Sequence, residues 1–78
     1  MPTVWRTGSF RFFFYSNEGT EPPHVHVQDG RKLAKFWLDP VSLAVSKHFN
    51  AHELSQLEHV VVDHHHQLME AWNDFFSS

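Results

Sequence analysis

The C-terminal third of the chain contains no glycine or proline between Asn50 and Phe75, so nothing in this stretch interrupts a helix. Asn50 is a favourable helix N-cap, and Glu53 stands three residues later, where a capping box places an acidic residue. Apolar side chains then recur at spacings of three, four and seven: Leu54, Leu57, Val61, Leu68, Trp72 and Phe75. The pattern predicts one long helix over about residues 51–75 with a single apolar face.

Turn-forming residues divide the first two-thirds of the chain into short runs. The run Ser9–Tyr15 (SFRFFFY) is strongly aromatic and follows Gly8, which favours a strand. Alternation places two sets of side chains on opposite faces of this strand, Phe10, Phe12 and Phe14 on one and Arg11, Phe13 and Tyr15 on the other. We expect the preceding residues, 3–8, to form a short partner strand.

Three further runs complete the predicted sheet: HVHVQ, KLAKFWL and VSLAV. The dipeptides Asp29-Gly30 and Asp39-Pro40 separate them, and both are typical of tight turns. We therefore expect an antiparallel meander of three to five strands within residues 3–47. With the helix packed on one face of this sheet, the fold class is α+β. The length of 78 residues suits a single domain over residues 1–78.

Composition excludes several classes of protein. The chain has no cysteine, which rules out disulfides and thiolate zinc sites and fits the reducing cytoplasm. No run approaches the roughly 20 apolar residues that a membrane span needs, so no membrane partner is expected. The formal net charge is −3 with neutral histidines. This charge disfavours a nucleic-acid partner held by bulk electrostatics.

Eight histidines are unusual in so short a chain, and helix geometry separates those in the C-terminal third. At about 100° per residue, His52, His59 and His66 point away from the apolar face. We expect these three to be exposed. His64 falls inside the apolar face, where its ring nitrogens need partners. We expect it to be buried and bonded to a strand carbonyl, or to face the histidines of the sheet.

The stretch TEPPHVHVQDG carries the remaining candidate chemistry. Pro22-Pro23 stiffens the backbone ahead of His24, and His24 and His26 project to one side of the strand. Burying two valines is cheaper than burying two imidazoles, so the valines should face the helix and the histidines should meet a ligand or partner. In the alternative orientation, His24 and His26 converge with His64 into a three-histidine zinc site. No cofactor is favoured, and zinc is the alternative.

The order of these features resembles a small bacterial family, the domain of unknown function DUF4160. The resemblance rests on Met1-Pro2-Thr3, on PPHVH at residues 22–26, and on His64, Leu68 and Trp72 along the helix. It covers nearly the whole chain. The chain departs from the family pattern in its longer loop SNEGTEPP, which lacks the usual aspartate–histidine, and in its less acidic middle strands.

Family membership would imply a protein partner or a regulatory role, because such genes often lie beside another small gene in toxin–antitoxin-like pairs. The resemblance also groups His24, His26, His64 and Trp72 as one set. It implies no particular chemistry.

The favoured function is therefore a small cytosolic interaction or regulatory module. Because one helix covers only one sheet face, the aromatic strand should expose large apolar groups to a protein partner or to a second copy in a homodimer. The expected binding residues are His24, His26, Arg11, Lys35 and Trp72.

The alternatives are a metal-binding domain built on His24, His26 and His64 and a histidine-based nuclease of toxin type. Imidazoles of His24, His26 or His64 would act as general base and acid, and Arg11, Lys32 or Lys35 would hold the phosphate.

Overall fold

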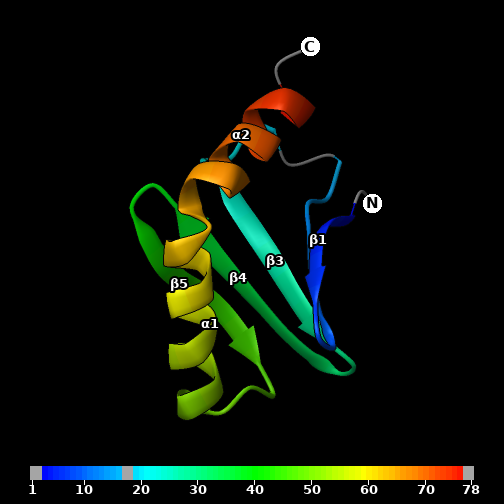
Figure 1. Cartoon of the computed structure of the whole chain (residues 1–78), viewed down its shortest axis with the longest axis vertical. Coiled ribbons are helices and arrows are strands. Elements are labelled where there is room, and N and C mark those ends of the chain that lie inside the picture. Colours follow the sequence, from blue (N-terminus) through cyan, green and yellow to red (C-terminus); the bar gives the residue numbers. More distant parts are fainter. Residues whose placement is uncertain (1–2, 17–18, 77–78) are drawn as a thin grey trace.

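The computed structural model describes residues 3–16 and 19–76, which form one five-stranded antiparallel sheet and two helices (Figure 1). The strands are β1 (Thr3–Thr7), β2 (Phe10–Phe13), β3 (His24–Asp29), β4 (Lys32–Leu38) and β5 (Val41–Lys47). The helices are α1 (Ala51–Asp63) and α2 (His65–Phe76). The predicted α+β class is confirmed.

The strands follow one another across the sheet in chain order, as expected of a meander. Two-residue turns at Gly8-Ser9, Gly30-Arg31 and Asp39-Pro40 join three of the four neighbouring pairs. The predicted turn at Asp29-Gly30 is wrong by one residue, because Asp29 pairs with Lys32. Gly30 instead takes the first turn position with φ of 60°, a left-handed conformation that glycine adopts without steric cost.

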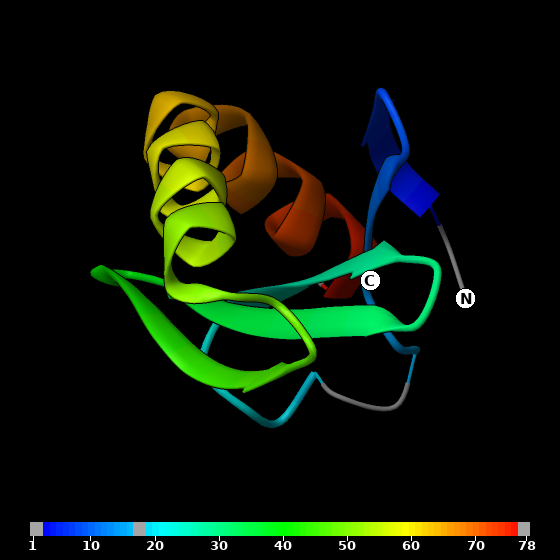
Figure 2. The ribbon, with the colours of Figure 1, turned by 90° about the horizontal axis from the view of Figure 1, so that it is seen from below.

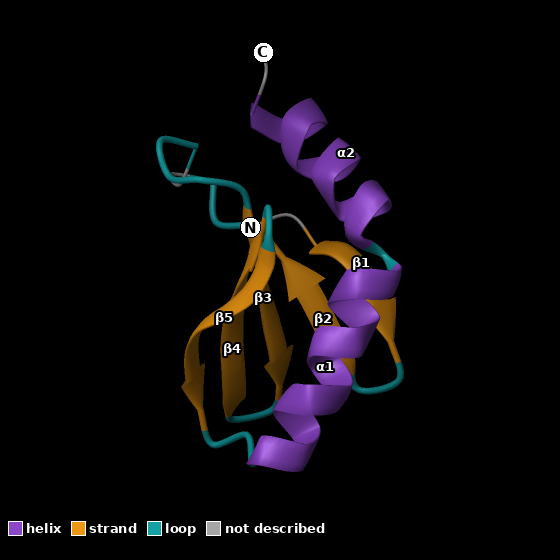
Figure 3. Ribbon diagram, turned by 90° about the vertical axis from the view of Figure 1, so that its left-hand side faces the viewer, coloured by secondary structure: helices purple, strands orange, loops and turns teal. Residues whose placement is uncertain are grey.

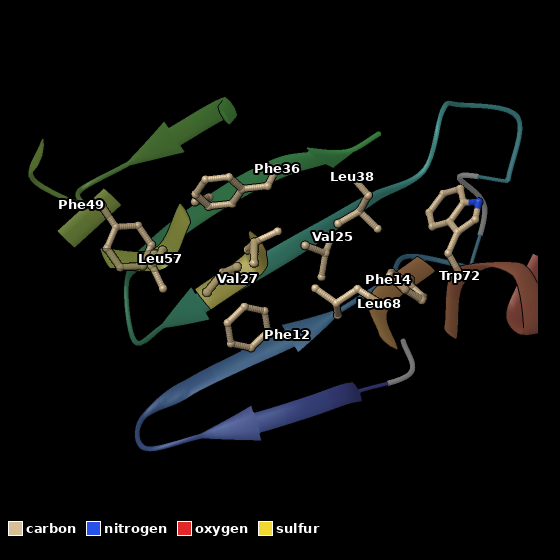
Figure 4. Close-up of a cluster of buried hydrophobic side chains, with 12 residues drawn as sticks. Phe12, Phe14, Val25, Val27, Phe36, Leu38, Phe49, Leu57, Leu68 and Trp72 are labelled. Carbon is tan, nitrogen blue, oxygen red and sulfur yellow. The ribbon is translucent and has the colours of Figure 1, made fainter. Parts of the chain in front are cut away.

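Both helices pack on the same face of the sheet and enclose the core (Figures 2 and 4). Val25 and Val27 of β3 lie in this core, which confirms that the valines face the helices. From the aromatic strand, Phe12 and the following Phe14 are buried there. The helices contribute Leu57, Val61, Leu68 and Trp72.

The predicted single helix is divided at His64, which is a correction to the sequence analysis. The imidazole Nδ1 of His64 lies 3.0 Å from the carbonyl oxygen of Val60, which also accepts the backbone N–H of His64 at 3.0 Å. A side chain that bonds the carbonyl four residues earlier, beside the backbone N–H, can bend a helix without glycine or proline. As a result α2 turns away from the axis of α1 (Figure 3).

The start of α1 has the predicted capping box. The Glu53 N–H donates to the Asn50 side chain at 2.8 Å, and the Asn50 N–H donates to the Glu53 carboxylate at 2.9 Å. The same carboxylate binds the ammonium of Lys32 on β4. Its hydrogen bond to Lys32, aided by the Asn50 N–H, lowers the pKa of Glu53, and the same bond raises the pKa of Lys32.

Within residues 3–16 and 19–76, neither helix combines the length and the apolar composition that crossing a membrane requires.

Candidate functional site

His24 and His26 alternate with Val25 and Val27 along β3, and so project to the outer face of the sheet. His24, at the start of the strand, also reaches Trp72 of α2. The two histidines are not open to solvent as expected, because His24 is 0% exposed and His26 is 7% exposed. The described part of the connection between β2 and β3 passes on this side of the sheet (Figure 2). The pair is therefore covered within the chain itself.

Aromatic rings surround both imidazoles. Phe13 stacks on His26 with 5.4 Å between ring centroids, and Tyr15 meets the same ring edge-on at 4.6 Å. The ring of His24 lies against those of Trp37 and Trp72, at 5.6 and 4.9 Å. The two imidazoles are 5.1 Å apart and nearly perpendicular.

The expectation of an exposed aromatic surface on β2 is thus wrong for Phe13, which is only 1% exposed. The rings of His26 and Tyr15 pack against its ring, and the guanidinium of Arg11 lies 4.4 Å from its centroid. Any contact surface on this face has to be formed by other side chains.

The two prolines position His24 through their carbonyl groups. His24 Nδ1 is 2.9 Å from the carbonyl oxygen of Pro22. Because a carbonyl can only accept, Nδ1 carries the proton, and Nε2 is the basic nitrogen of the neutral ring. The carbonyl of Pro23 accepts the N–H of Leu38 at 3.0 Å and so extends the pairing of β3 with β4. The stiff approach thus fixes both the strand and the imidazole.

Two of the predicted cationic residues share the outer face with the histidines. Arg11 donates to the side chain of Gln28 at 3.4 Å. Lys35 pairs with Glu21 at 2.8 Å, and its ammonium lies 4.5 Å from the centroid of Trp37. Lys32, the third predicted phosphate ligand, instead pairs with a helix residue on the other face.

A groove of about 240 Å³ adjoins His26 on the outer face. Its lining residues are His26, Leu33, Ala34, Lys35, Val45 and Lys47. The contribution of β5 was missed in the sequence because the β4–β5 register shifts between Lys35 and Phe36. Such a bulge places Val45 opposite Lys35, an assignment that strict alternation does not supply.

His64 lies on the helix side and not beside the histidine pair. Its ring packs at a tilt of 35° against Trp5 of β1, with 4.1 Å between centroids, and is half-buried. It bonds to a carbonyl of its own helix and not to a strand carbonyl, which corrects that expectation. In the described part of the chain, no three histidine, cysteine or acidic residues are placed to hold a metal ion. The predicted convergence of His24, His26 and His64 is therefore wrong.

The remaining predicted residues are either exposed on the surface or buried in the core. His52, His59 and His66 are exposed, as predicted, and His66 forms only a surface pair with Glu70 at 3.2 Å. Trp72 is 5% exposed and belongs to the core. It therefore supports His24 from within and offers no contact surface, contrary to its predicted binding role.

The fold and this site define a small α+β domain with a meander sheet, a two-helix cover on one face and a buried histidine pair on the other. Residues 9–73 match the model of the family described as Domain of unknown function (DUF4160), and the chain belongs to that family. The match runs from the start of β2 into α2 and confirms the resemblance seen in the sequence. No curated protein and no solved structure matches the chain.

Proposed function

We propose that this protein is a non-enzymatic interaction module that binds an acidic, extended segment of a protein partner in the groove beside His26. The supporting observation is the charge of the groove, whose charged side chains Lys35 and Lys47 are both cations. Leu33 and Val45 supply its apolar surface, and Val45 is 54% exposed. A segment that alternates acidic and apolar side chains matches both properties.

The two lysines have different roles in this proposal. Lys35 already pairs with the half-exposed Glu21. A partner carboxylate therefore either shares the Lys35 ammonium with Glu21 or replaces Glu21 there. Lys47 is exposed and makes no ion pair with any residue in the described ranges. A partner carboxylate at Lys47 therefore forms a new ion pair and displaces none.

The histidine pair gives this groove its shape. His26 forms one wall, and its ring is fixed by stacking on Phe13 and by the edge of Tyr15. His24 supports that ring from behind and is itself fixed by Pro22. We therefore assign partner contact to His26 and a positioning role to His24.

The proposed partner is the product of a neighbouring small gene, as the toxin–antitoxin-like arrangements of the family imply. The absence of cysteine is compatible with a cytoplasmic site of action. A second copy of this chain is the competing occupant.

A histidine-based nuclease is a weaker candidate. In its favour, the two imidazoles are 5.1 Å apart, one has a defined tautomer, and Arg11 and Lys35 share their face. Against it, His24 is fully buried, so a phosphodiester cannot reach the ring. Cleavage of RNA that is lost on replacing His26 but not Arg6 would favour the nuclease over the interaction module.

The direct test is the affinity for a labelled eight-residue peptide of alternating valine and glutamate, measured by fluorescence anisotropy. Lys47→Glu should weaken binding at least about tenfold, because it replaces attraction by like-charge repulsion. Arg6→Glu makes the same charge change at an exposed residue of β1, and it should leave the affinity unchanged. Equal losses in the two variants, or equal binding of a valine–lysine peptide, would overturn the proposal. A concentration-dependent dimer that Lys47→Glu dissociates would assign the groove to a second copy.

A further inference from the structure

A second and larger cavity, of about 470 Å³, lies on the helix side of the molecule where the helix is divided. Its lining residues are Val4, Trp5, His64, Gln67 and Leu68. None of them lines the groove beside His26. The volume falls within the range of about 300–1,000 Å³ that is usual for small-molecule sites.

His64 is one of the lining residues, and its ring carries a fixed hydrogen-bond acceptor. Its Nδ1 donates to the carbonyl of Val60, so Nε2 carries the lone pair of the neutral ring. Nε2 has no hydrogen-bond partner among the described residues. Close packing against the ring of Trp5, with 4.1 Å between centroids, limits rotation of the imidazole. The acceptor is therefore held in place before any ligand arrives, which reduces the entropy lost on binding.

Gln67 adds a second polar group, one helical turn beyond the break. Its side chain is exposed and presents both an amide donor and a carbonyl acceptor. The remaining lining residues are aromatic or aliphatic, and none is a lysine, an arginine or an acid. A phosphate or carboxylate ligand would find no cation here, so the cavity favours an uncharged ligand.

We propose that this cavity binds an uncharged planar heterocycle of the nucleobase class. An N–H of the heterocycle donates to His64 Nε2, and its neighbouring donor and acceptor pair with the amide of Gln67. Trp5 and Leu68 cover its apolar surface. This inference is independent of the acidic-peptide groove, because the two sites share no residue.

Nuclear magnetic resonance titration with adenosine and with cytidine, using ribose as the control, tests the proposal. At least one nucleoside should shift the indole resonance of Trp5 and the side-chain amide of Gln67, whereas ribose should shift neither. Gln67→Ala should weaken the binding of that nucleoside roughly three- to tenfold, because the hydrogen bonds of the Gln67 amide are lost. Gln56→Ala, a matched change at an exposed site of α1, should have no effect.

Both substituted residues are exposed, so neither variant should unfold, and the two nucleoside affinities can be compared directly. Absence of these shifts at millimolar nucleoside, or equal weakening by Gln67→Ala and Gln56→Ala, would overturn the proposal. Equal shifts with ribose would overturn it as well, because they would assign the binding to the sugar.

Discussion

Replacing His24 by alanine should lower the free energy of unfolding by about 2–4 kcal/mol. The side chain is fully buried between the rings of Trp37 and Trp72, so its removal leaves a cavity. The hydrogen bond from Nδ1 to the carbonyl of Pro22 is lost as well, at a cost of about 1 kcal/mol. A domain of this length has a total stability of roughly 4–12 kcal/mol, so the variant loses a large part of it.

Urea denaturation followed by tryptophan fluorescence measures this loss, because both flanking rings report on unfolding. His66→Ala is the matched control, and it should cost almost nothing because its side chain is 87% exposed. His24→Phe keeps the ring and removes the donor, so it should fall between the two. If His24→Ala and His66→Ala lose the same stability, the burial of His24 and the role assigned to it are both refuted.

Three further changes test other parts of the fold. Asn50→Ala should cost about 1 kcal/mol in thermal or urea unfolding, since it removes the helix cap. Glu53→Gln should make the stability depend less on pH in the acidic range. The bond to Lys32 lowers the folded-state pKa of Glu53, so this group stabilises the fold above about pH 4.5, and that stabilisation disappears as the pH falls through the folded-state pKa. Gly19→Val should destabilise the protein, because a Cβ at Gly19 would lie 2.7 Å from the ring of Phe76; a neutral result in the same unfolding assay would contradict that close approach.

Local patterns predicted most of the fold. The absence of breakers and the Asn50–Glu53 cap located the start of α1, and alternation correctly turned Val25 and Val27 toward the core. The division of the helix at His64 was not predictable from composition. It arises when an imidazole competes for a backbone carbonyl, and no glycine or proline marks the position.

The candidate site was predicted less completely. The sequence identified His24 and His26 as a pair on the outer face, but it did not reveal that Phe13, Tyr15 and Trp37 bury them. Phe13 and Trp37 are the cross-strand partners of His26 and His24, so this cover depends on the strand register, which the sequence analysis did not assign. The groove was missed for a related reason, because a bulge in β5 determines which of its side chains reach the outer face.

Mapping of amide chemical shifts during titration with the valine–glutamate peptide shows directly whether the groove beside His26 is the binding surface. The shifts should concentrate at His26, Leu33, Val45 and Lys47, with the amides of α1 unmoved, and Lys47→Glu should raise the peptide concentration that produces them at least about tenfold. Shifts confined to the helix side, or an unchanged titration with Lys47→Glu, would refute this assignment.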